Sequence, residues 1–255
     1  MAPLRRALVL LVAVAAAVAI GALCLAPAAL VDSRIAQMTG GTLRVAAAEG
    51  TIWRARGVLV ARGMRMPVAW RIDPWPLMRG ELRLHVMPDA GGMTASPRAD
   101  IAVSGDHGAL RDVDVIVPAS LLVPDSGPAA TWVVAGDVGV TTAAMDWTPN
   151  AVRGDARLHW RGARLVLADG IAPLDLGDLR AALTANGDRL AGPVSNDGGD
   201  FAIRGEITFR ANEAVALSLR LTPRGPVDAT LARALSAFGT GGSEGWRIDW
   251  RVPLR

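Results

Sequence analysis

Apolar and polar residues alternate with a period of two along most of the sequence that follows Thr42. The alternation is clearest in four runs, at 82–86, 113–117, 201–209 and 215–221. Successive side chains of a β-strand point to opposite faces, so this period gives each strand one apolar and one polar face. Antiparallel sheets commonly bury one face and leave the other in water. The pattern therefore predicts a mainly β protein built on a mostly antiparallel β-sheet domain.

Turn residues separate several of these runs. The sequences Asn-Gly-Asp at 186–188 and Asn-Asp-Gly-Gly at 196–199 lie between alternating segments. Asn and Gly tolerate the positive φ angles of tight turns, so both sequences predict hairpins between neighbouring strands.

Only one long segment of the β-rich region has the spacing of a helix, at 227–238. Pro226 precedes it and Gly239 follows it, as is common at the start and the end of a helix. Shorter helical segments are predicted at 31–38 and at 119–123. The expected fold is a β-sheet domain with one C-terminal α-helix.

Residues 7–31 form an apolar run without a single charge. About 20 apolar helical residues cross the roughly 30 Å hydrocarbon core of a bilayer, so the run predicts a transmembrane helix. Arg5 and Arg6 precede it, and positive flanking residues tend to stay in the cytoplasm. We expect a cytoplasmic N-terminus at 1–6, a signal-anchor in the inner membrane at 7–31 and a periplasmic domain at 32–255. The residues predicted to form the membrane anchor are Ala7, Leu8, Val9, Leu10, Leu11, Ile20, Leu23 and Leu25.

A cleavable signal peptide is the alternative to a retained anchor. Ala26-Pro27-Ala28 has the small-x-small form of a cleavage site, but Pro between the small residues disfavours cleavage. The run is also longer than the apolar region of a usual signal peptide. Lipidation of Cys24 is a further alternative, although Leu23 before it is too large for a typical lipoprotein signal. A retained signal-anchor is favoured.

The charge composition argues against a nucleic-acid-binding protein. The formal net charge is +3, and the sequence has no Lys, so its cations apart from His are Arg. Two arginines precede the apolar run, which leaves the remaining domain near neutral and without a basic stripe. The single Cys, Cys24, lies within the run, which excludes a disulfide framework in the domain.

No motif predicts a catalytic residue, a cofactor site or a metal site. The segment 241–245 matches the Gly-x-Ser-x-Gly pattern of a nucleophile elbow, but that motif follows a strand and begins a helix. Here a predicted helix precedes the segment and a predicted strand follows it. A phosphate-binding P-loop needs the lysine that this chain lacks, and the three His residues are not at zinc-ligand spacing. We therefore expect no cofactor and no enzymatic activity.

The chain has eight Trp residues and no Tyr. Core filling with a hydrogen-bonded indole N–H is the simpler interpretation, and an exposed groove or partner face is the alternative. Trp75 is the best candidate for the surface, because Pro74 and Pro76 on either side prevent regular strand pairing there.

Two short sequences occur twice. The segment 53–61 aligns without a gap with 160–168, and Trp-Arg-Ile-Asp occurs at 70–73 and at 246–249. The two spacings differ, so the chain is not one tandem repeat. Two related β-halves would explain the first pair, and chance similarity between alternating strands would explain it equally. The halves would be 42–123 and 131–255.

A set of Gly, Trp, Pro and Leu residues then follows the apolar run in a characteristic order. Its first part comprises Gly50, Thr51, Trp53, Trp70, Pro74, Leu77, Gly80 and Leu82, and its later part lies at 154–160, 173–179, 205–207, 217–223 and 231–239. With the anchor before it, this order resembles the type II secretion system protein N family. In that family an anchor is followed by a Gly-Thr-x-Trp strand and a Trp-x-x-x-Pro-x-x-Leu element.

The resemblance implies an accessory inner-membrane component that supports protein export across the outer membrane by contacts with other secretion-apparatus subunits. It brings no catalytic residues. Together with the surface candidate Trp75, the motif residues make up a candidate partner surface of Gly50, Thr51, Trp53, Trp70, Pro74, Trp75 and Leu77. A second hypothesis is an AsmA-like envelope module that holds or passes lipid along the apolar face of its sheet. That hypothesis is motivated by the small number of helices available to cover such a face.

Overall fold

The computed structural model describes residues 26–41, 43–61, 64–88, 97–122, 133–166, 173–210, 214–242 and 244–253. The chain divides into two compact units, Met1–Ser96 and Pro97–Arg255. The predicted anchor residues from Ala7 to Leu25 lie outside the described residues.

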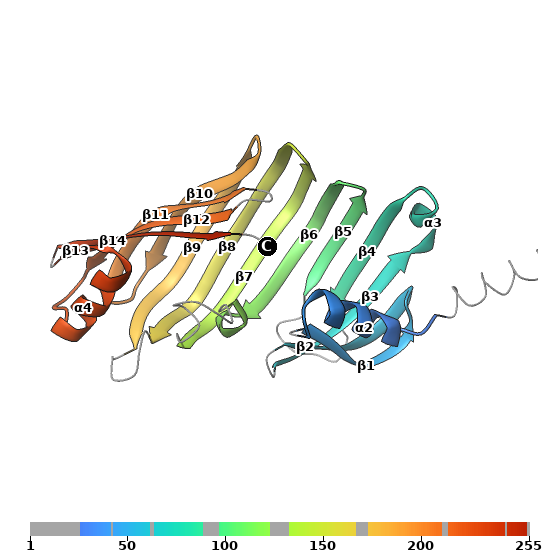
Figure 1. Cartoon of the computed structure of the whole chain (residues 1–255), viewed down its shortest axis with the longest axis horizontal. Helices are drawn as coiled ribbons and strands as arrows, with labels where there is room; N and C mark the ends of the chain where they lie inside the picture. The colour runs from blue at the N-terminus through green and yellow to red at the C-terminus, as the bar shows by residue number, and fades with distance from the viewer. Residues whose placement is uncertain are drawn as a thin grey trace, which may run out of the picture. The chain divides into compact units, whose positions relative to one another are not determined.

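The first unit is an antiparallel meander of strands accompanied by one helix (Figure 1). Each strand pairs with the next one along the chain. Its elements are α2 (Ala29–Met38), β1 (Leu43–Thr51), β2 (Arg54–Ala61), β3 (Met64–Asp73), the helical turn α3 (Pro74–Leu77) and β4 (Glu81–Pro88).

The core of the first unit lies between α2 and the sheet. Val31 and Ile35, one helical turn apart, pack against a buried cluster that includes Trp70 of β3. The other members of this cluster are Ala28, Val45, Ala55 and Val68. Burying these side chains favours docking of the helix, because apolar burial contributes about 25 cal/mol per Å².

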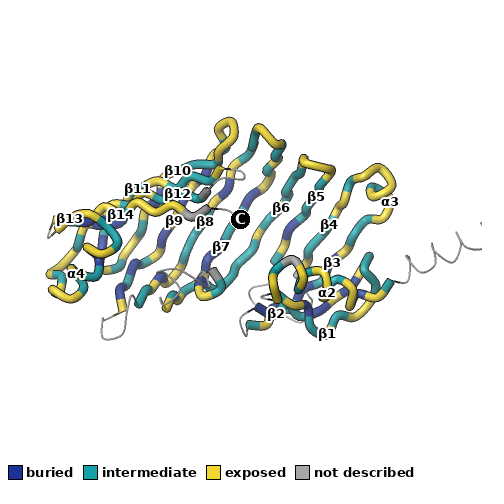
Figure 2. The backbone as a smooth tube through the Cα atoms, viewed as in Figure 1, coloured by how far each residue is buried: buried dark blue, intermediate teal, exposed yellow. Residues whose placement is uncertain are grey.

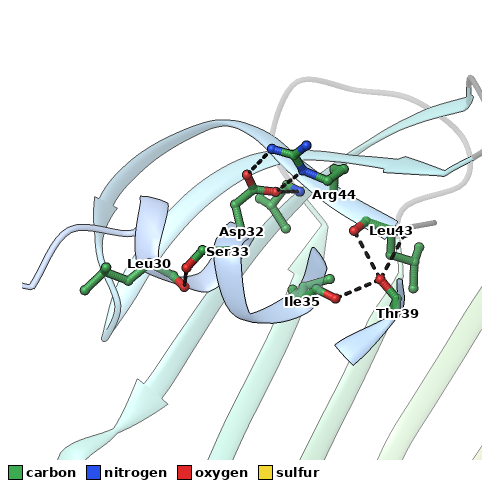
Figure 3. Close-up of polar contacts among 8 residues, drawn as sticks. Leu30, Asp32, Ser33, Ile35, Thr39, Leu43 and Arg44 are labelled. Atoms are coloured by element: carbon green, nitrogen blue, oxygen red, sulfur yellow. Dashed lines mark hydrogen bonds and ion pairs between the residues drawn. The ribbon is translucent and has the colours of Figure 1, made fainter. Parts of the chain in front are cut away.

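A carboxylate on α2 joins the helix to the first strand (Figure 3). The Asp32 carboxylate accepts from Arg44 Nε at 3.0 Å, from Arg44 Nη2 at 2.8 Å and from the Val45 backbone N–H at 2.8 Å. The Arg44 hydrogen bonds, followed by the Val45 N–H, lower the pKa of Asp32 from 3.8 to about 2. At the other end of the helix, Thr39 Oγ1 donates to Ile35 O at 2.7 Å and accepts from Leu43 N at 3.2 Å.

The second unit is a longer antiparallel meander, in the strand order β5-β6-β7-β8-β9-β10-β11-β12-β14-β13. Its first elements are β5 (Arg98–Ser104), β6 (His107–Pro118), the 3₁₀ turn η1 (Ala119–Leu122), β7 (Val133–Thr148) and β8 (Ala151–Val166). The chain continues with β9 (Leu174–Asn186), β10 (Arg189–Asp197), β11 (Phe201–Arg210) and β12 (Ala214–Pro223). It ends with α4 (Ala229–Phe238), β13 (Thr240–Gly242) and β14 (Gly245–Pro253).

Burial alternates along the central strands of this unit (Figure 2). In β9, Leu179, Ala181 and Leu183 are buried, whereas Arg180 and Ala182 between them are exposed. The buried face continues onto β11 and β14, where the rings of Phe201 and Trp246 meet edge to face with centroids 6.0 Å apart. The apolar face is therefore a single core shared by strands β8 to β12 and β14.

Helix α4 covers part of this apolar face. Leu235 is only 2% exposed and belongs to the buried cluster, and Leu231 and Phe238 pack beside it. Asp228 precedes the first residue of the helix, and its carboxylate accepts from Thr230 N at 3.1 Å. This is the usual arrangement of an N-terminal cap.

Bulges interrupt the pairing of β7 with β8 and of β8 with β9. At the first of these, Gly136 has φ +98°, and a Cβ there would lie 2.3 Å from Arg161 O. Only Gly fits this position without displacing backbone. Bulges bend strands and increase their twist.

The structure confirms a mainly β, antiparallel fold, both hairpin turns and the C-terminal helix. The helix starts at Ala229 and not at Val227, because the Asp228 side chain sets its first turn. The predicted helical segment at 31–38 is confirmed within α2, and 119–122 is a 3₁₀ turn. The division between the units falls after Ser96, ahead of the joint at 123–131 that two β-halves would have.

None of the helices in the described part of the chain has the length and the apolar character needed to cross a membrane. The last residues of the apolar run, from Ala26 to Val31, belong to the folded first unit. Pro27 forms a β-bridge with Thr51, and Ala28 is 1% exposed.

Candidate functional site

The second unit contains an apolar cavity of about 330 Å³. Strands β8 to β12, β14 and helix α4 all contribute to its wall. The wall is made almost entirely of aliphatic and aromatic side chains, among them Leu158, Trp160, Leu176, Ile203, Leu219, Leu235, Phe238 and Trp250.

The cavity exists because the sheet curls. Five strand-to-strand steps separate β8 from β14, and neighbouring strands lie about 4.8 Å apart, so a flat sheet would hold them about 24 Å apart. Leu158 of β8 and Ile248 of β14 nevertheless line the same cavity. Figure 1 is consistent with this, as β12 and β14 are drawn in front of β8 and β9.

The polar groups near the cavity have partners outside it. Trp160 Nε1 donates to Ala135 O at 3.0 Å, and Trp246 Nε1 donates to Ser236 Oγ at 3.2 Å. Two charged residues contribute to the wall, but Arg180 pairs with Asp197 and Asp249 accepts from Ser218. An occupant of this cavity would therefore be held by apolar contact and not by hydrogen bonds.

The first unit carries a second candidate surface, at the connection between β3 and β4. Trp75 is 68% exposed and Met78 is 79% exposed, and Leu77 and Leu82 are also exposed. Pro74 begins the helical turn α3, and no described side chain of α3 is buried. We call Trp75, Leu77, Met78 and Leu82 the apolar tip. The expectation that Trp75 lies on the surface is confirmed.

The remaining residues of the candidate partner surface have structural roles. Trp70 is buried and its Nε1 donates to Ile52 O at 3.2 Å. Gly50 has φ +106°, and a Cβ there would lie 2.5 Å from Arg54 O. Thr51 Oγ1 accepts from Arg54 N at 3.4 Å, and Trp53 O accepts from Ile72 N at 2.7 Å.

The structure therefore separates the residues of the predicted partner surface into two groups. Gly50, Thr51, Trp53 and Trp70 shape and pack the β1–β2 turn, whereas Pro74, Trp75 and Leu77 form an exposed element at the end of β3. The sequence did not indicate Met78, which is the most exposed member of the apolar tip. Its only signal is its place directly after the Pro-Trp-Pro-Leu turn.

The segment that matched the nucleophile-elbow pattern is the connection between β13 and β14, which pair with each other. It follows a helix and a short strand and leads into a strand. Ser243 itself lies outside the described residues. Among the residues that the structure describes, no three His, Cys, Asp or Glu side chains are grouped so that they could hold a metal ion.

Together these features define a β-meander protein with a helix-covered apolar interior in one unit and an exposed apolar tip in the other. Residues 41–248 match the family described as Type II secretion system (T2SS), protein N. The match covers most of the chain, and the chain belongs to this family, as the order of its Gly, Trp, Pro and Leu residues predicted. Membership links the chain to type II secretion. Neither the curated proteins nor the solved structures include a match to it.

Proposed function

We propose that the protein is a non-enzymatic accessory component of the type II secretion system that works by protein–protein contact. In this proposal the N-terminal run holds it in the inner membrane and the two units lie in the periplasm, where they support export across the outer membrane. The family match at 41–248 carries the proposal, because it extends over both units.

The edge of β14 is the contact surface that the fold supports best. β13 pairs only with Gly245–Arg247 of β14. From Ile248 to Pro253, β14 pairs with β12 on one side, and no described strand pairs with it on the other. Unpaired strand edges are sites where another protein can add a strand through backbone hydrogen bonds.

Photocrosslinking in the native envelope tests this contact. The chain has no Lys, so amine-directed crosslinkers are poorly suited and a photoreactive amino acid is needed. Placed at Arg251, which is exposed on β14, it should crosslink to another secretion subunit. The matched control is Arg204, which is exposed on β11 between two paired strands and should give no such product.

Two results would contradict the proposal. Equal yields of the same product from positions 251 and 204 would exclude the edge as the contact. Wild-type levels of secretion in a clean deletion strain would exclude a required role in export.

A second candidate function rests on the cavity alone. Its wall has the chemistry of an acyl-chain site, because the polar groups around it already have partners. A volume of about 330 Å³ is within the usual range for small-ligand pockets. The proposal is that this unit holds the chain of an envelope lipid.

A photoreactive fatty acid supplied to growing cells tests this second function. Peptides that line the cavity should be labelled, and Ala181→Phe, which fills the cavity from β9, should abolish the labelling. Ala182→Phe is the control, because Ala182 is exposed on the opposite face of the same strand. Absence of label on the wild-type cavity peptides would rule out the acyl-chain function.

A further inference from the structure

The buried cluster of the first unit, and the side chains that pack against it, include no residue of the apolar tip. A single exposed apolar side chain is ordinary, but Trp75, Leu77 and Met78 are all exposed in one strand connection. Leu82, the second residue of β4, is exposed beside them in the sequence. The connection is held in shape by its own backbone. Met78 N donates to Trp75 O at 3.2 Å and Gly80 N donates to Leu77 O at 3.0 Å. The tip is therefore a preformed element that presents apolar side chains to its surroundings.

The chain enters the first unit at the same end of the sheet. Ile52 N donates to Ala26 O at 2.9 Å, and Ala28 N donates to Gly50 O at 3.1 Å, so the entering segment runs antiparallel to the end of β1. The entering segment therefore begins, at Ala26, on the side of the β1–β2 turn. The turn is tied to the end of β3, because Ile72 N donates to Trp53 O at 2.7 Å.

Two residues after Ile72, the helical turn α3 begins with Pro74. The apolar tip and the point at which the chain enters thus lie at one end of the four-stranded sheet. The run before that point, residues 7–25, contains no charge. As a helix it would be about 28 Å long, close to the thickness of a bilayer core.

The charges around the tip suit an anionic lipid surface. Arg79 is exposed within the connection itself. The two nearby carboxylates are paired, Asp73 with Arg71 at 3.0 Å and Glu81 with Arg83 at 2.7 Å. Trp is favoured at the membrane–water interface, and Arg can place its charge in the headgroup layer while its stem covers apolar surface.

We propose that the apolar tip lies in the interfacial layer of the bilayer that the N-terminal run enters, so that the first unit is held against the membrane at two points. The inference rests on the membrane placement in the proposed function. It goes further by naming the lipid interface as the partner of Trp75, Leu77, Met78 and Leu82. The surface used for secretion subunits is then the edge of β14 and not this tip.

Environment-sensitive fluorescence tests the proposal in the full chain. Since Cys24 is the only Cys, a Cys24→Ser background allows a single label to be placed by Met78→Cys. Arg65→Cys is the control, because Arg65 is exposed near the opposite end of β3, about 26 Å from Asp73 along the strand. Both labelled chains are reconstituted into nanodiscs of phosphatidylethanolamine and phosphatidylglycerol.

The label at position 78 should show a blue-shifted, several-fold brighter emission that spin-labelled lipids quench, and the label at position 65 should not. Emission from position 78 that matches position 65 and is quenched by iodide would overturn the proposal. Failure of the chain to enter the discs would overturn it as well, as would shielding of position 78 only when other envelope proteins are present. The discs contain no secretion subunits, so the crosslinking result at position 251 stands or fails separately.

Discussion

At the scale of single residues, Asp32 makes the first unit sensitive to acid. Its pKa is about 2 in the folded chain against an ordinary 3.8, chiefly because of the Arg44 hydrogen bonds. A folded pKa below the unfolded one means that the ionised carboxylate stabilises the fold above about pH 4, and that this contribution disappears as the pH falls toward 2. Asp32→Asn should therefore lower the free energy of unfolding at pH 7, and the deficit should shrink between pH 4 and pH 2.

Urea unfolding at several pH values in detergent measures this difference. Asp188→Asn, in the β9–β10 turn, is the control and should change stability little at any pH. A deficit for Asp32→Asn that stays constant down to pH 2 would refute the role assigned to the carboxylate.

Gly136 offers a second test at this scale. Its φ of +98° and the 2.3 Å approach of Arg161 O mean that an added Cβ would meet both backbone strain and a clash. Gly187, in the β9–β10 turn, has φ +66° but no atom within 4 Å of an added Cβ. Gly187→Ala should cost about 1 kcal/mol, and Gly136→Ala should cost at least about 2 kcal/mol more. Thermal unfolding measures both losses of stability. Equal losses for the two variants would show that the β7–β8 bulge can rearrange to accommodate the methyl group.

At the scale of elements, the start of α4 is set by one side chain. Asp228 accepts from Thr230 N at 3.1 Å. Asp228→Ala removes this acceptor and should destabilise the second unit by about 1 kcal/mol, whereas Asp228→Asn should keep most of the stability. Chemical denaturation of the three chains compares them, and an unchanged midpoint for Asp228→Ala would mean that Val227 and Leu231 alone hold the first turn.

The same element shows what sequence can and cannot predict. The spacing of Leu231, Leu235 and Phe238 was enough to predict a helix, because one apolar face over several turns is a strong local signal. Its first residue was misplaced, because Pro226 is a weaker start signal than the Asp228 side chain bonded to the backbone. Strands were predictable from alternation in the same way. The surface position of Trp75 was predictable from the prolines on either side of it.

The cavity could not be predicted, and the reason lies in how sheets bend. Alternation along β9 indicates that Leu179 and Ala181 share a face, but it carries no information on which distant strand faces them. That depends on the twist accumulated between β8 and β14 and on bulges such as the one at Gly136. The exposure of Trp75 in the apolar tip was predicted, but that of Met78 was not. Exposure of Met78 follows from the geometry of α3, which the sequence pattern does not give.

At the scale of the whole molecule, each unit has its own buried cluster. Leu235 is 2% exposed in the cluster of the second unit, and its truncation to Ala should cost that unit about 2–5 kcal/mol. The cluster around Trp70 contains no residue of the second unit, so amides of β1 to β4 should keep their protection. Hydrogen exchange with mass spectrometry measures amide protection in both units of the Leu235→Ala chain. Equal loss of protection in the two units would indicate that they unfold as a single cooperative structure.

The pairing of strands with their neighbours in sequence also bears on how fast the chain acquires its structure. Within each unit almost every strand pairs with the one before it, so most paired strands are joined by a short connection. Closing a short connection costs little loop entropy, so each hairpin can form before the more distant strands have paired. A chain that emerges N-terminus first can add one strand at a time to the edge of the sheet already formed. β14 is the exception, because it pairs with β12 and can do so only after the intervening helix α4 has been added.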